Sequence, residues 1–510
     1  MATLTLNPTS LSDYKTFLRV KSLPVFSIRG REAWFPDEYA DRIGLRLSRS
    51  IACDYTPSPF LFDYQRDISA LAIRKRKFAL FMDCGLGKTL IYFDYIRAAM
   101  QAMQNRGALI LSPAMVVDQT LEECQRWHGD GLAIERIESR DLGAWLKSCA
   151  GKIGITNYEA LRNDVDRGEL GALVADESSL LKSHYGKYGT QVINLGKGLE
   201  WKLAGTGTPA PNDRIEYANH AVLLDHFPTV NSFLAKYFVN RGQTCERWSL
   251  KPHALEPFYR SLSDWCIFLT NPAVYGWKDN CESLPPIHIH QHEVEMTDAQ
   301  HSAVRTQTGN LFASKAGGIT KRSTLSRIAK GLDGTETRKY DYIETMLQSW
   351  PEESTIVWCW FNDEQDRLAA LLPGSASIDG STPHAKRLEL IADFKAGRRK
   401  VLISKPKVLG FGLNLQIATR QVFSSLIDSY EQYYQAVKRS NRYGSTKPLN
   451  VHIPILDVER PMVENVLRKA KLVQRDTEQQ EQIFRAAKDG KSVAAIVNRE
   501  GIDVDSFTGD

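Results

Sequence analysis

The stretch from Phe78 to Thr89 reads FALFMDCGLGKT, and it decides the fold of the chain around it. Its first part, Phe78 to Met82, is a continuous apolar run of the length expected for a buried strand. A turn with two glycines follows, and then a helical pattern that runs through Ala99. Strand, glycine turn and helix in this order bring backbone N–H groups and the positive end of a helix to one point. The stretch therefore predicts a phosphate-binding loop.

Individual residues of this turn suit the chemistry of a nucleotide. Gly85 and Gly87 allow the backbone to approach an anion closely. The Lys88 ammonium would neutralise the β- and γ-phosphates, and the Thr89 hydroxyl would be a ligand of Mg²⁺. Met82 occupies the first glycine position of the general pattern, so the match is incomplete. A glycine-rich turn with an incidental lysine is the alternative, but the strand–turn–helix context favours the nucleotide.

A pair of acidic residues ends a second predicted strand, which covers residues 172–175. Asp176 would help to hold Mg²⁺. Glu177 would orient and deprotonate an attacking water. Acidic pairs are common on protein surfaces. Only the position of this pair, at a strand end downstream of the phosphate loop, favours a role in the nucleotide site.

Short apolar runs alternate with helical patterns in two parts of the chain. The expected strands are 78–82, 108–111, 152–155 and 172–175 in the first part and 355–358, 400–403 and 450–454 in the second, with helices at 117–127 and 386–394. Continuous apolar strands that alternate with helices are typical of a parallel sheet covered on both faces. We therefore predict an α/β protein with two parallel-sheet lobes.

The domain organisation that we expect has a small leader and two lobes separated by a mostly helical insertion. The parts are a leader (1–55), lobe 1 (56–225), the insertion (226–335), lobe 2 (336–470) and a helical tail (471–510). The leader is basic and aromatic between Lys15 and Phe35. It either contacts DNA or is a small domain with a solvated basic face.

Composition excludes several classes of protein. The 510 residues are 43% hydrophobic and 25% charged, as in ordinary globular proteins. A net charge of +5 permits nucleic acid as a partner without arguing for it. The eight cysteines include no C-x-x-C pair, so we expect reduced thiols and no zinc site of the usual spacing. No secretory signal and no apolar run of about 18 residues is visible, which predicts a cytoplasmic protein without a membrane span.

With these motifs the sequence resembles the superfamily 2 helicases, and within them the Swi/Snf remodeller-like branch, from about Tyr64 to Lys471. The phosphate loop differs from the form usual in the branch only by Cys84, which replaces a methionine. Gln65 occupies the position of a glutamine that hydrogen-bonds to the edge of adenine in this branch. An amide suits this contact because it can donate and accept a hydrogen bond at once. The resemblance implies two RecA-like lobes of the P-loop NTPase type, with ATP and Mg²⁺ as cofactors.

The resemblance also implies contacts with the backbone of a nucleic acid. The implied contact residues are Ser112, Pro113, Thr156 and Thr208 in lobe 1 and Gly380, Lys407 and Asn414 in lobe 2. They belong to motif Ia, the segment after it, motif III, the Asp-Gly-Ser-Thr segment and motif V. Gly412, also in motif V, is implied to contact the nucleotide. Motif III continues to Asn212.

Two motifs differ from the usual form of the family. In the segment that usually reads Asp-Glu-Ala-His, Ser179 replaces the histidine. In motif VI, Lys438 replaces a glycine and Asn441 a histidine, whereas Arg439 and Arg442 are retained. The resemblance assigns to these arginines the guanidinium that stabilises charge on the γ-phosphoryl group in the transition state. A basic helix face is the alternative for two arginines three residues apart.

Three histidines alternate along an expected strand that begins at Ile287. His288, His290 and His292 would share one face of that strand. They would either bind a metal or lie on the polar face of an edge strand, and the second reading is the simpler one.

The resemblance implies an ATP-driven motor that moves along double-stranded DNA by gripping the backbone, with tolerance of sequence and strong dependence on salt. A strand-separating helicase is one alternative. A nucleotide-controlled clamp, whose ATPase DNA barely stimulates, is another. A small-molecule kinase is disfavoured by the motifs of lobe 2. The chain looks like a minimal bacterial or phage-type member, we expect a monomer, and no protein partner is predicted.

Overall fold

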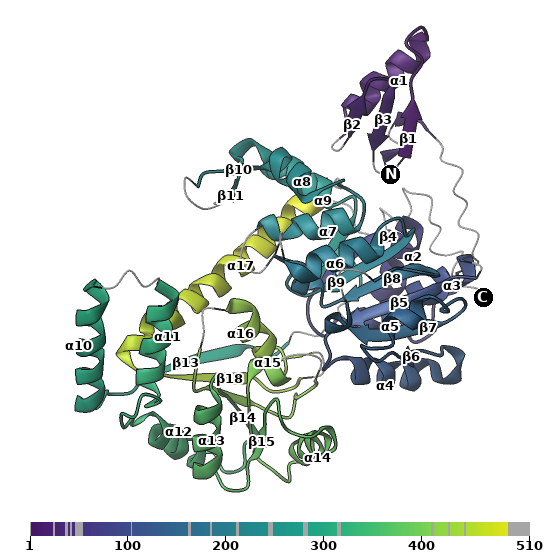
Figure 1. The fold of residues 1–510 in the computed structure, drawn as a ribbon. Helices are drawn as coiled ribbons and strands as arrows, with labels where there is room; N and C mark the ends of the chain where they lie inside the picture. The colour runs from purple at the N-terminus through teal and green to yellow at the C-terminus, as the bar shows by residue number, and fades with distance from the viewer. Residues whose placement is uncertain are drawn as a thin grey trace. The chain divides into compact units, whose positions relative to one another are not determined.

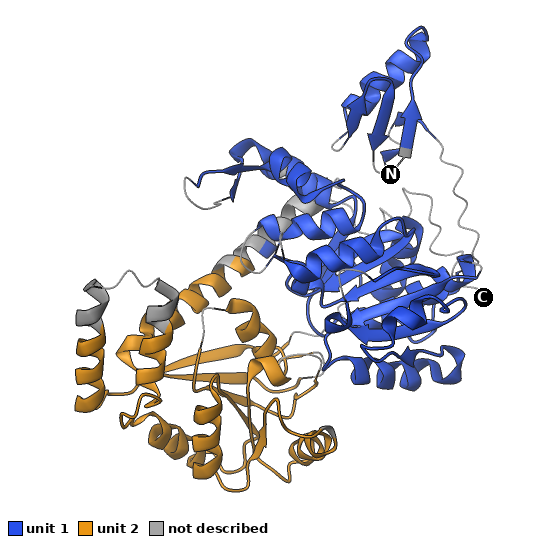
Figure 2. Ribbon diagram, viewed as in Figure 1, with its two compact units in different colours: residues 1–280, 475–510 blue, residues 281–474 orange. Residues whose placement is uncertain are grey.

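The computed structural model describes most of the chain in two compact units. The described residues are 2–23, 26–35, 39–40, 43–45, 55–103, 105–161, 165–183, 186–210, 214–242, 248–278, 284–313, 318–409, 413–426, 429–442 and 445–487. One unit comprises residues 1–280 with 475–510, and the other comprises residues 281–474 (Figure 2). Each unit contains one large sheet, lobe 1 in the first and lobe 2 in the second.

The sheet of lobe 1 has seven strands in the order β12-β4-β9-β8-β5-β7-β6, and every neighbouring pair is parallel. The strands are β4 (Lys77–Met82), β5 (Gly107–Ser112), β6 (Glu135–Arg136), β7 (Ile153–Asn157), β8 (Leu170–Asp176), β9 (Trp201–Thr206) and β12 (Cys266–Leu269). The four strands predicted in this part of the chain are confirmed. The central strands β4, β5 and β8 are buried almost throughout, which is why their sequences read as continuous apolar runs.

Helices pack around this sheet (Figure 1). They are α2 (Asp63–Lys75), α3 (Lys88–Ala102), α4 (Val117–His128), α5 (Leu142–Leu146), α6 (Lys187–Gly196) and α7 (Tyr217–Leu223). The predicted helices after the phosphate loop and at 117–127 are confirmed. Helices α8 (Val230–Tyr237) and α9 (Leu255–Leu262) accompany a short hairpin, β10 (Phe238–Asn240) with β11 (Trp248–Leu250). Their aromatic side chains pack together, as Phe233, Tyr237 and Phe258 do with ring centroids 5.4–6.0 Å apart.

The sheet of lobe 2 has six strands in the order β13-β18-β17-β14-β16-β15, again all parallel. The strands are β13 (Ile287–Glu293), β14 (Thr355–Trp358), β15 (Ala376–Ile378), β16 (Val401–Ser404), β17 (Arg420–Phe423) and β18 (Leu449–Ile455). The helices are α10 (Asp298–Ala313), α11 (Gly318–Ala329), α12 (Lys339–Gln348), α13 (Asn362–Leu371), α14 (His384–Lys395), α15 (Pro406–Leu409), α16 (Tyr430–Val437) and α17 (Arg460–Ala487). The prediction of two parallel-sheet α/β lobes is therefore confirmed.

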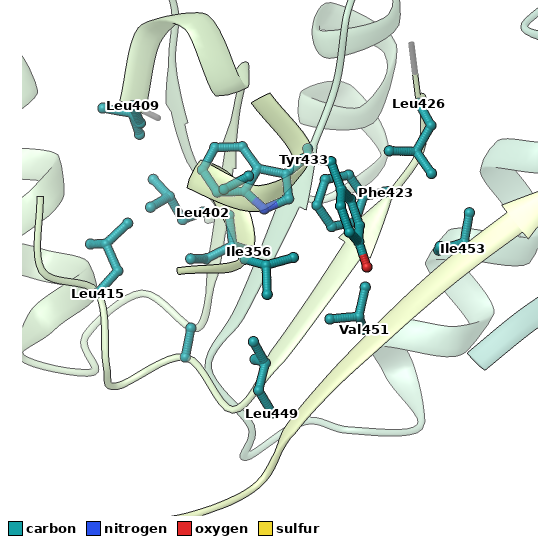
Figure 3. Close-up of a cluster of buried hydrophobic side chains, with 14 of the residues drawn as sticks. Ile356, Leu402, Leu409, Leu415, Phe423, Leu426, Tyr433, Leu449, Val451 and Ile453 are labelled. Atoms are coloured by element: carbon teal, nitrogen blue, oxygen red, sulfur yellow. The ribbon is translucent and has the colours of Figure 1, made fainter. Parts of the chain in front are cut away.

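One face of the lobe 2 sheet forms a dense apolar core (Figure 3). Ile356 and Leu402 lie on the neighbouring strands β14 and β16, and Val451 lies on β18. Phe423, on β17 between β14 and β18, meets Tyr433 of α16 with ring centroids 5.2 Å apart. Burying each such side chain stabilises the fold by about 1.5–3 kcal/mol. Helix α16 is thereby fixed on the sheet.

The segment predicted as a helical insertion contributes a strand to each sheet. Strand β12 lies at one edge of the lobe 1 sheet and β13 at one edge of the lobe 2 sheet. Both lobes thus extend further into residues 226–335 than the sequence suggests. The edge position of β13 agrees with the simpler reading of its alternating histidines. Among the described residues, no three histidine, cysteine, aspartate or glutamate side chains are arranged to hold a metal ion.

The leader forms a small antiparallel sheet with one helix. Its elements are β1 (Ala2–Thr5), α1 (Leu11–Lys21), β2 (Ser27–Arg29) and β3 (Glu32–Phe35), with strand order β1-β3-β2. Ser10 caps α1 by accepting from the N–H of Asp13. In the part of the chain that the structure describes, no helix is long and apolar enough to cross a membrane.

Candidate nucleotide-binding site

The phosphate loop joins the end of β4 to the start of α3. Gly85 and Gly87 have φ values of 91° and 68°, in the left-handed region that favours glycine. A Cβ on residue 87 would lie 2.3 Å from the Nε2 atom of Gln65. Glycine is therefore required at 87 both for the turn and for the approach of the neighbouring side chain.

Lys88 is the first residue of α3 and is 9% exposed. Its Nζ donates to the carbonyl oxygens of Met82, at 2.9 Å, and Asp83, at 3.4 Å. The ammonium is thus held over the strand end by two carbonyl dipoles, while Thr89 beside it is half-buried. These are the two residues that the sequence predicts to bind phosphate and Mg²⁺.

Gln65 links the start of α2 to the phosphate loop. Its Oε1 accepts from the N–H of Phe62 at 3.0 Å, and its Nε2 donates to the Leu86 carbonyl at 3.1 Å. The hydroxyl of Tyr64 donates to the same carbonyl, also at 3.1 Å. The amide that the sequence singled out for adenine is therefore fixed in orientation against the loop.

Trp277 and Lys278 support the start of α2, and the sequence did not indicate this support. Trp277 packs beside Tyr64, with ring centroids 6.4 Å apart, and its Nε1 donates to the Asp67 carboxylate at 2.7 Å. The N–H of Lys278 donates to Asp63. The partners are more than 200 residues apart in the sequence, so only the fold could reveal them.

Asp176 ends β8 and accepts two hydrogen bonds from side-chain hydroxyls. Its Oδ2 accepts from the Ser112 hydroxyl at 2.9 Å, and its carbonyl accepts from the Tyr158 hydroxyl at 2.6 Å. Burial, together with the charge of Glu177, raises the pKa of Asp176 to about 6 despite the opposing effects of Lys88 and Ser112. A cation next to two adjacent carboxylates in a buried setting stabilises their charged forms. The residues therefore fit Mg²⁺.

Glu177 adopts the left-handed conformation, with φ of 46°. Such a conformation costs a non-glycine residue on the order of 1–3 kcal/mol and persists where the surroundings enforce it. Thr206 donates to the Glu177 carboxylate at 3.5 Å, and the N–H of Thr208 donates to the Thr206 hydroxyl at 3.1 Å. Motif III is thus in contact with the candidate general base.

The two arginines of motif VI converge within lobe 2. Nη1 of Arg439 and Nη1 of Arg442 both donate to the Leu413 carbonyl, at 3.4 Å and 3.3 Å. Arg439 is only 2% exposed, and its own carbonyl accepts from the N–H of Leu415. Motifs V and VI therefore form one structure, in which the guanidinium groups lie side by side.

Gln421, in the middle of β17, is a buried support that the sequence did not indicate. Its Nε2 donates to the Ala436 carbonyl at 3.0 Å and to the Ser440 hydroxyl at 2.8 Å. Its Oε1 accepts from Nε1 of Trp358 at 3.0 Å. These bonds fix the end of α16 on either side of Arg439.

The implied nucleic-acid contacts of lobe 1 are all buried. Ser112, Pro113, Thr156 and Thr208 have little or no exposed surface. The hydroxyl of Ser112 bonds to Asp176, and the hydroxyl of Thr156 donates to the Ile137 carbonyl at 2.8 Å. The hydroxyls of Ser112 and Thr156 are thus engaged within the lobe, so contacts with a nucleic acid at these two positions would have to come from the loop backbone. The Thr208 hydroxyl is buried and has no hydrogen-bond partner among the described residues.

The implied contacts of lobe 2 are exposed. Gly380, Lys407 and Asn414 all lie at the surface. The loop around Gly380 is organised by Asp379, whose Oδ1 accepts from the N–H groups of Ser381, at 2.9 Å, and Thr382, at 2.8 Å. Hydrogen bonds from these two residues lower the pKa of Asp379. The remaining predicted positions, Gly412 and Asn212, lie outside the described residues.

Comparison with family models gives two matches. Residues 69–341 match the SNF2-related domain, and residues 338–444 match the helicase conserved C-terminal domain. Over 148 residues, or 28% of this chain, the sequence is 30% identical to the ATP-dependent helicase fft1 of Schizosaccharomyces pombe. The matched part is 15% of the length of that relative.

Two solved structures are also similar. The SWI2/SNF2 ATPase core of Sulfolobus solfataricus in complex with dsDNA has a TM-score of 0.40 and 19% identity, covering 87% of this chain and 98% of that one. The Hef helicase domain of Pyrococcus furiosus has a TM-score of 0.44 and 12% identity, covering 79% of this chain and 97% of that one.

Proposed function

Because this chain belongs to the SNF2-related family of superfamily 2 helicases, we propose that it is a DNA-dependent ATPase that couples ATP hydrolysis to movement along double-stranded DNA. The observation that carries the proposal is the cluster formed by Lys88, Asp176 and Glu177. The charges of Glu177 and Lys88 act on the Asp176 carboxylate in opposite directions, and hydrogen bonds from Ser112 and Thr206 hold the two carboxylates.

Each residue of this cluster has a defined task. When bound, ATP presents a γ-phosphoryl group and Mg²⁺ supplies positive charge at its oxygens. Lys88 would bind the phosphates, and Thr89 with Asp176 would hold the metal. Glu177 would orient the attacking water and accept its proton. Gln65 would select adenine.

Arg439 and Arg442 would provide the charge that the resemblance assigns to the transition state. Such a guanidinium contributes on the order of a thousandfold or more to turnover. Their shared carbonyl partner, Leu413, keeps the two groups together. Since motif V supplies that carbonyl, a change in its loop would alter both arginines at once.

Double-stranded DNA is the substrate that we propose for the exposed loops of lobe 2. Gly380, Lys407 and Asn414 present an N–H group, an ammonium and an amide, which are donors suited to phosphate oxygens. Contacts of this kind tolerate any base sequence and weaken as the salt concentration rises.

The test is ATP turnover measured without nucleic acid and with single-stranded DNA, duplex DNA and RNA. We expect strong stimulation by duplex DNA alone, and its loss in Lys88→Ala and Glu177→Gln. Turnover that duplex DNA leaves unchanged would favour the nucleotide-controlled clamp. Displacement of a third strand from a triplex without separation of a duplex would then distinguish a translocase from a strand-separating helicase.

A further inference from the structure

Helix α7 holds the loop that carries Glu177. This loop continues into a short 3₁₀ helix, η5 (Ser178–Leu181). Nε2 of His220, on α7, lies 2.9 Å from the Ser178 hydroxyl. Nδ2 of Asn219, the preceding residue, donates to the carbonyls of Leu181 at 2.6 Å and Ser183 at 2.7 Å. Adjacent residues of one helix therefore bond to both ends of η5.

The packing around Asn219 and His220 of α7 is close. His220 is 0% exposed and Asn219 is 1% exposed. A Cβ on Gly189 of α6 would lie 2.3 Å from Nδ2 of Asn219, so glycine is needed there for the approach. His220 also meets the edge of Phe81, on β4, with ring centroids 5.3 Å apart. The imidazole thus touches the strand that leads into the phosphate loop as well as the loop of Glu177.

The His220 imidazole is neutral, and the hydroxyl of the neighbouring Ser179 makes no hydrogen bond among the described residues that could hold η5 in its place. Burial lowers the pKa of His220 to about 4, so no positive charge is added beside the acidic pair. Ser179, which replaces the histidine usual in the family, is buried, and among the described residues its hydroxyl has no hydrogen-bond partner. His220 is therefore the side chain that fixes the start of η5.

We propose that His220 is a positioning residue for Glu177, acting through the Ser178 hydroxyl. A bond to residue 178 constrains the backbone of residue 177, which is already held in the left-handed conformation. Helix α7 follows motif III in the sequence, and its residues Asn219 and His220 contact the loop of the candidate general base. It therefore links motif III to that loop. The inference rests on the proposed ATPase activity.

The experiment compares duplex-stimulated ATP turnover in wild type, His220→Ala, His220→Gln and Ser178→Ala. We expect kcat to fall roughly tenfold in His220→Ala, which corresponds to the loss of about one hydrogen bond. KM for ATP should change less than twofold. His220→Gln should restore most of kcat, because its amide nitrogen can replace Nε2. Ser178→Ala, which removes only one oxygen, should match His220→Ala, and the double variant should be no worse than either.

His226 provides a matched control. It is equally buried and stacks on Trp265 with ring centroids 5.5 Å apart. His226→Ala should reduce stability without lowering kcat. Wild-type kcat in Ser178→Ala and His220→Ala, additive losses in the double variant, or an equal loss of kcat in His226→Ala would each overturn the inference. If wild type itself hydrolyses no ATP, the proposed function fails instead.

Discussion

The two lobes share one kind of sheet but use their polar side chains differently. In lobe 1, Ser112 and Asp176 end neighbouring strands, are buried and are hydrogen-bonded to each other. In lobe 2 the corresponding loop residues Lys407 and Asn414 are exposed. Under the proposed function, this difference would suit a rigid chemical site in lobe 1 and contacts with DNA in the loops of lobe 2.

Lobe 2 also buries charge, but as part of its packing. Nζ of Lys330 lies 2.7 Å from one Glu459 oxygen, and Nζ of Lys339 lies 2.5 Å from the other. The three side chains are at most 4% exposed. The lysines lower the pKa of Glu459 to about 2, against the effect of burial.

The largest effect is expected from Glu459→Gln. This change leaves two buried ammonium groups without a counter-charge, and removal of one partner of a buried ion pair costs about 3–5 kcal/mol. Chemical denaturation followed by tryptophan fluorescence would measure it. Glu295→Gln breaks an exposed ion pair with Arg338 and should cost about 0–1 kcal/mol. Equal stability of the two variants would show that the buried triad has no structural role.

Acid should destabilise lobe 2 through a histidine cluster. Nδ1 of His452 lies 3.0 Å from Nε2 of His292, and its ring stacks on that of His290 at 4.7 Å. Burial and then the charges of His290, His292 and Arg420 lower the pKa of His452 to about 3. In the unfolded chain His452 takes up a proton near pH 6.5, whereas in the folded chain it stays neutral down to about pH 3. Its effect on the free energy of unfolding is therefore absent above pH 6.5, and the folded state is progressively destabilised as the pH falls from there towards 3.

The slope from this one residue is up to about 1.4 kcal/mol per pH unit within that window. Unfolding measured between pH 7 and pH 4 should show it, and His452→Gln should flatten the profile. A profile that His452→Gln leaves unchanged would assign the acid sensitivity to other groups.

Ser112→Ala tests the chemical role of the buried hydroxyls in lobe 1. Loss of its hydrogen bond to Asp176 should lower kcat roughly tenfold, which corresponds to about 1.4 kcal/mol, and should leave the affinity for duplex DNA within about twofold. Turnover and DNA binding would be measured on the same preparation. A loss of DNA affinity at unchanged kcat would instead support the contact implied by the resemblance, and would remove the contrast between the lobes.

Lys407→Ala is expected to have the smallest effect. In contrast to Ser112→Ala, it should change DNA affinity and not kcat. DNA affinity should fall a few-fold, and the slope of log affinity against log salt should decrease by about one. Turnover at saturating DNA should be unchanged. Binding isotherms at several salt concentrations provide the measurement, and an unaltered slope would exclude a phosphate contact by this lysine.

The sequence reveals features that depend on local pattern. The strand from Phe78 and the glycine turn after it were predicted correctly, because burial on both faces demands a continuous apolar run. Strands β9 and β17 were not predicted. Strand β17 reads Arg-Gln-Val-Phe, and its buried Gln421 is satisfied only by partners from other elements.

The sequence indicated the residues of the candidate site but not their supports. The motif order pointed to Lys88, Asp176 and Glu177, which the structure places at or near strand ends, and their roles stay a prediction. Trp277 and His220 act through contacts with residues 210 and 42 positions away, which no local pattern encodes. The burial of Ser112 was missed for the same reason, because a hydroxyl at a strand end faces either solvent or a neighbouring strand.

We propose that hydrolysis needs Arg439 of lobe 2 as well as Lys88 of lobe 1. The most direct test is ATP turnover at saturating duplex DNA, measured together with nucleotide affinity, for Arg439→Ala and Arg439→Lys. We predict nucleotide affinity within about threefold of wild type and a loss of turnover on the order of a thousandfold in Arg439→Ala. Wild-type turnover in both folded variants would contradict the claim.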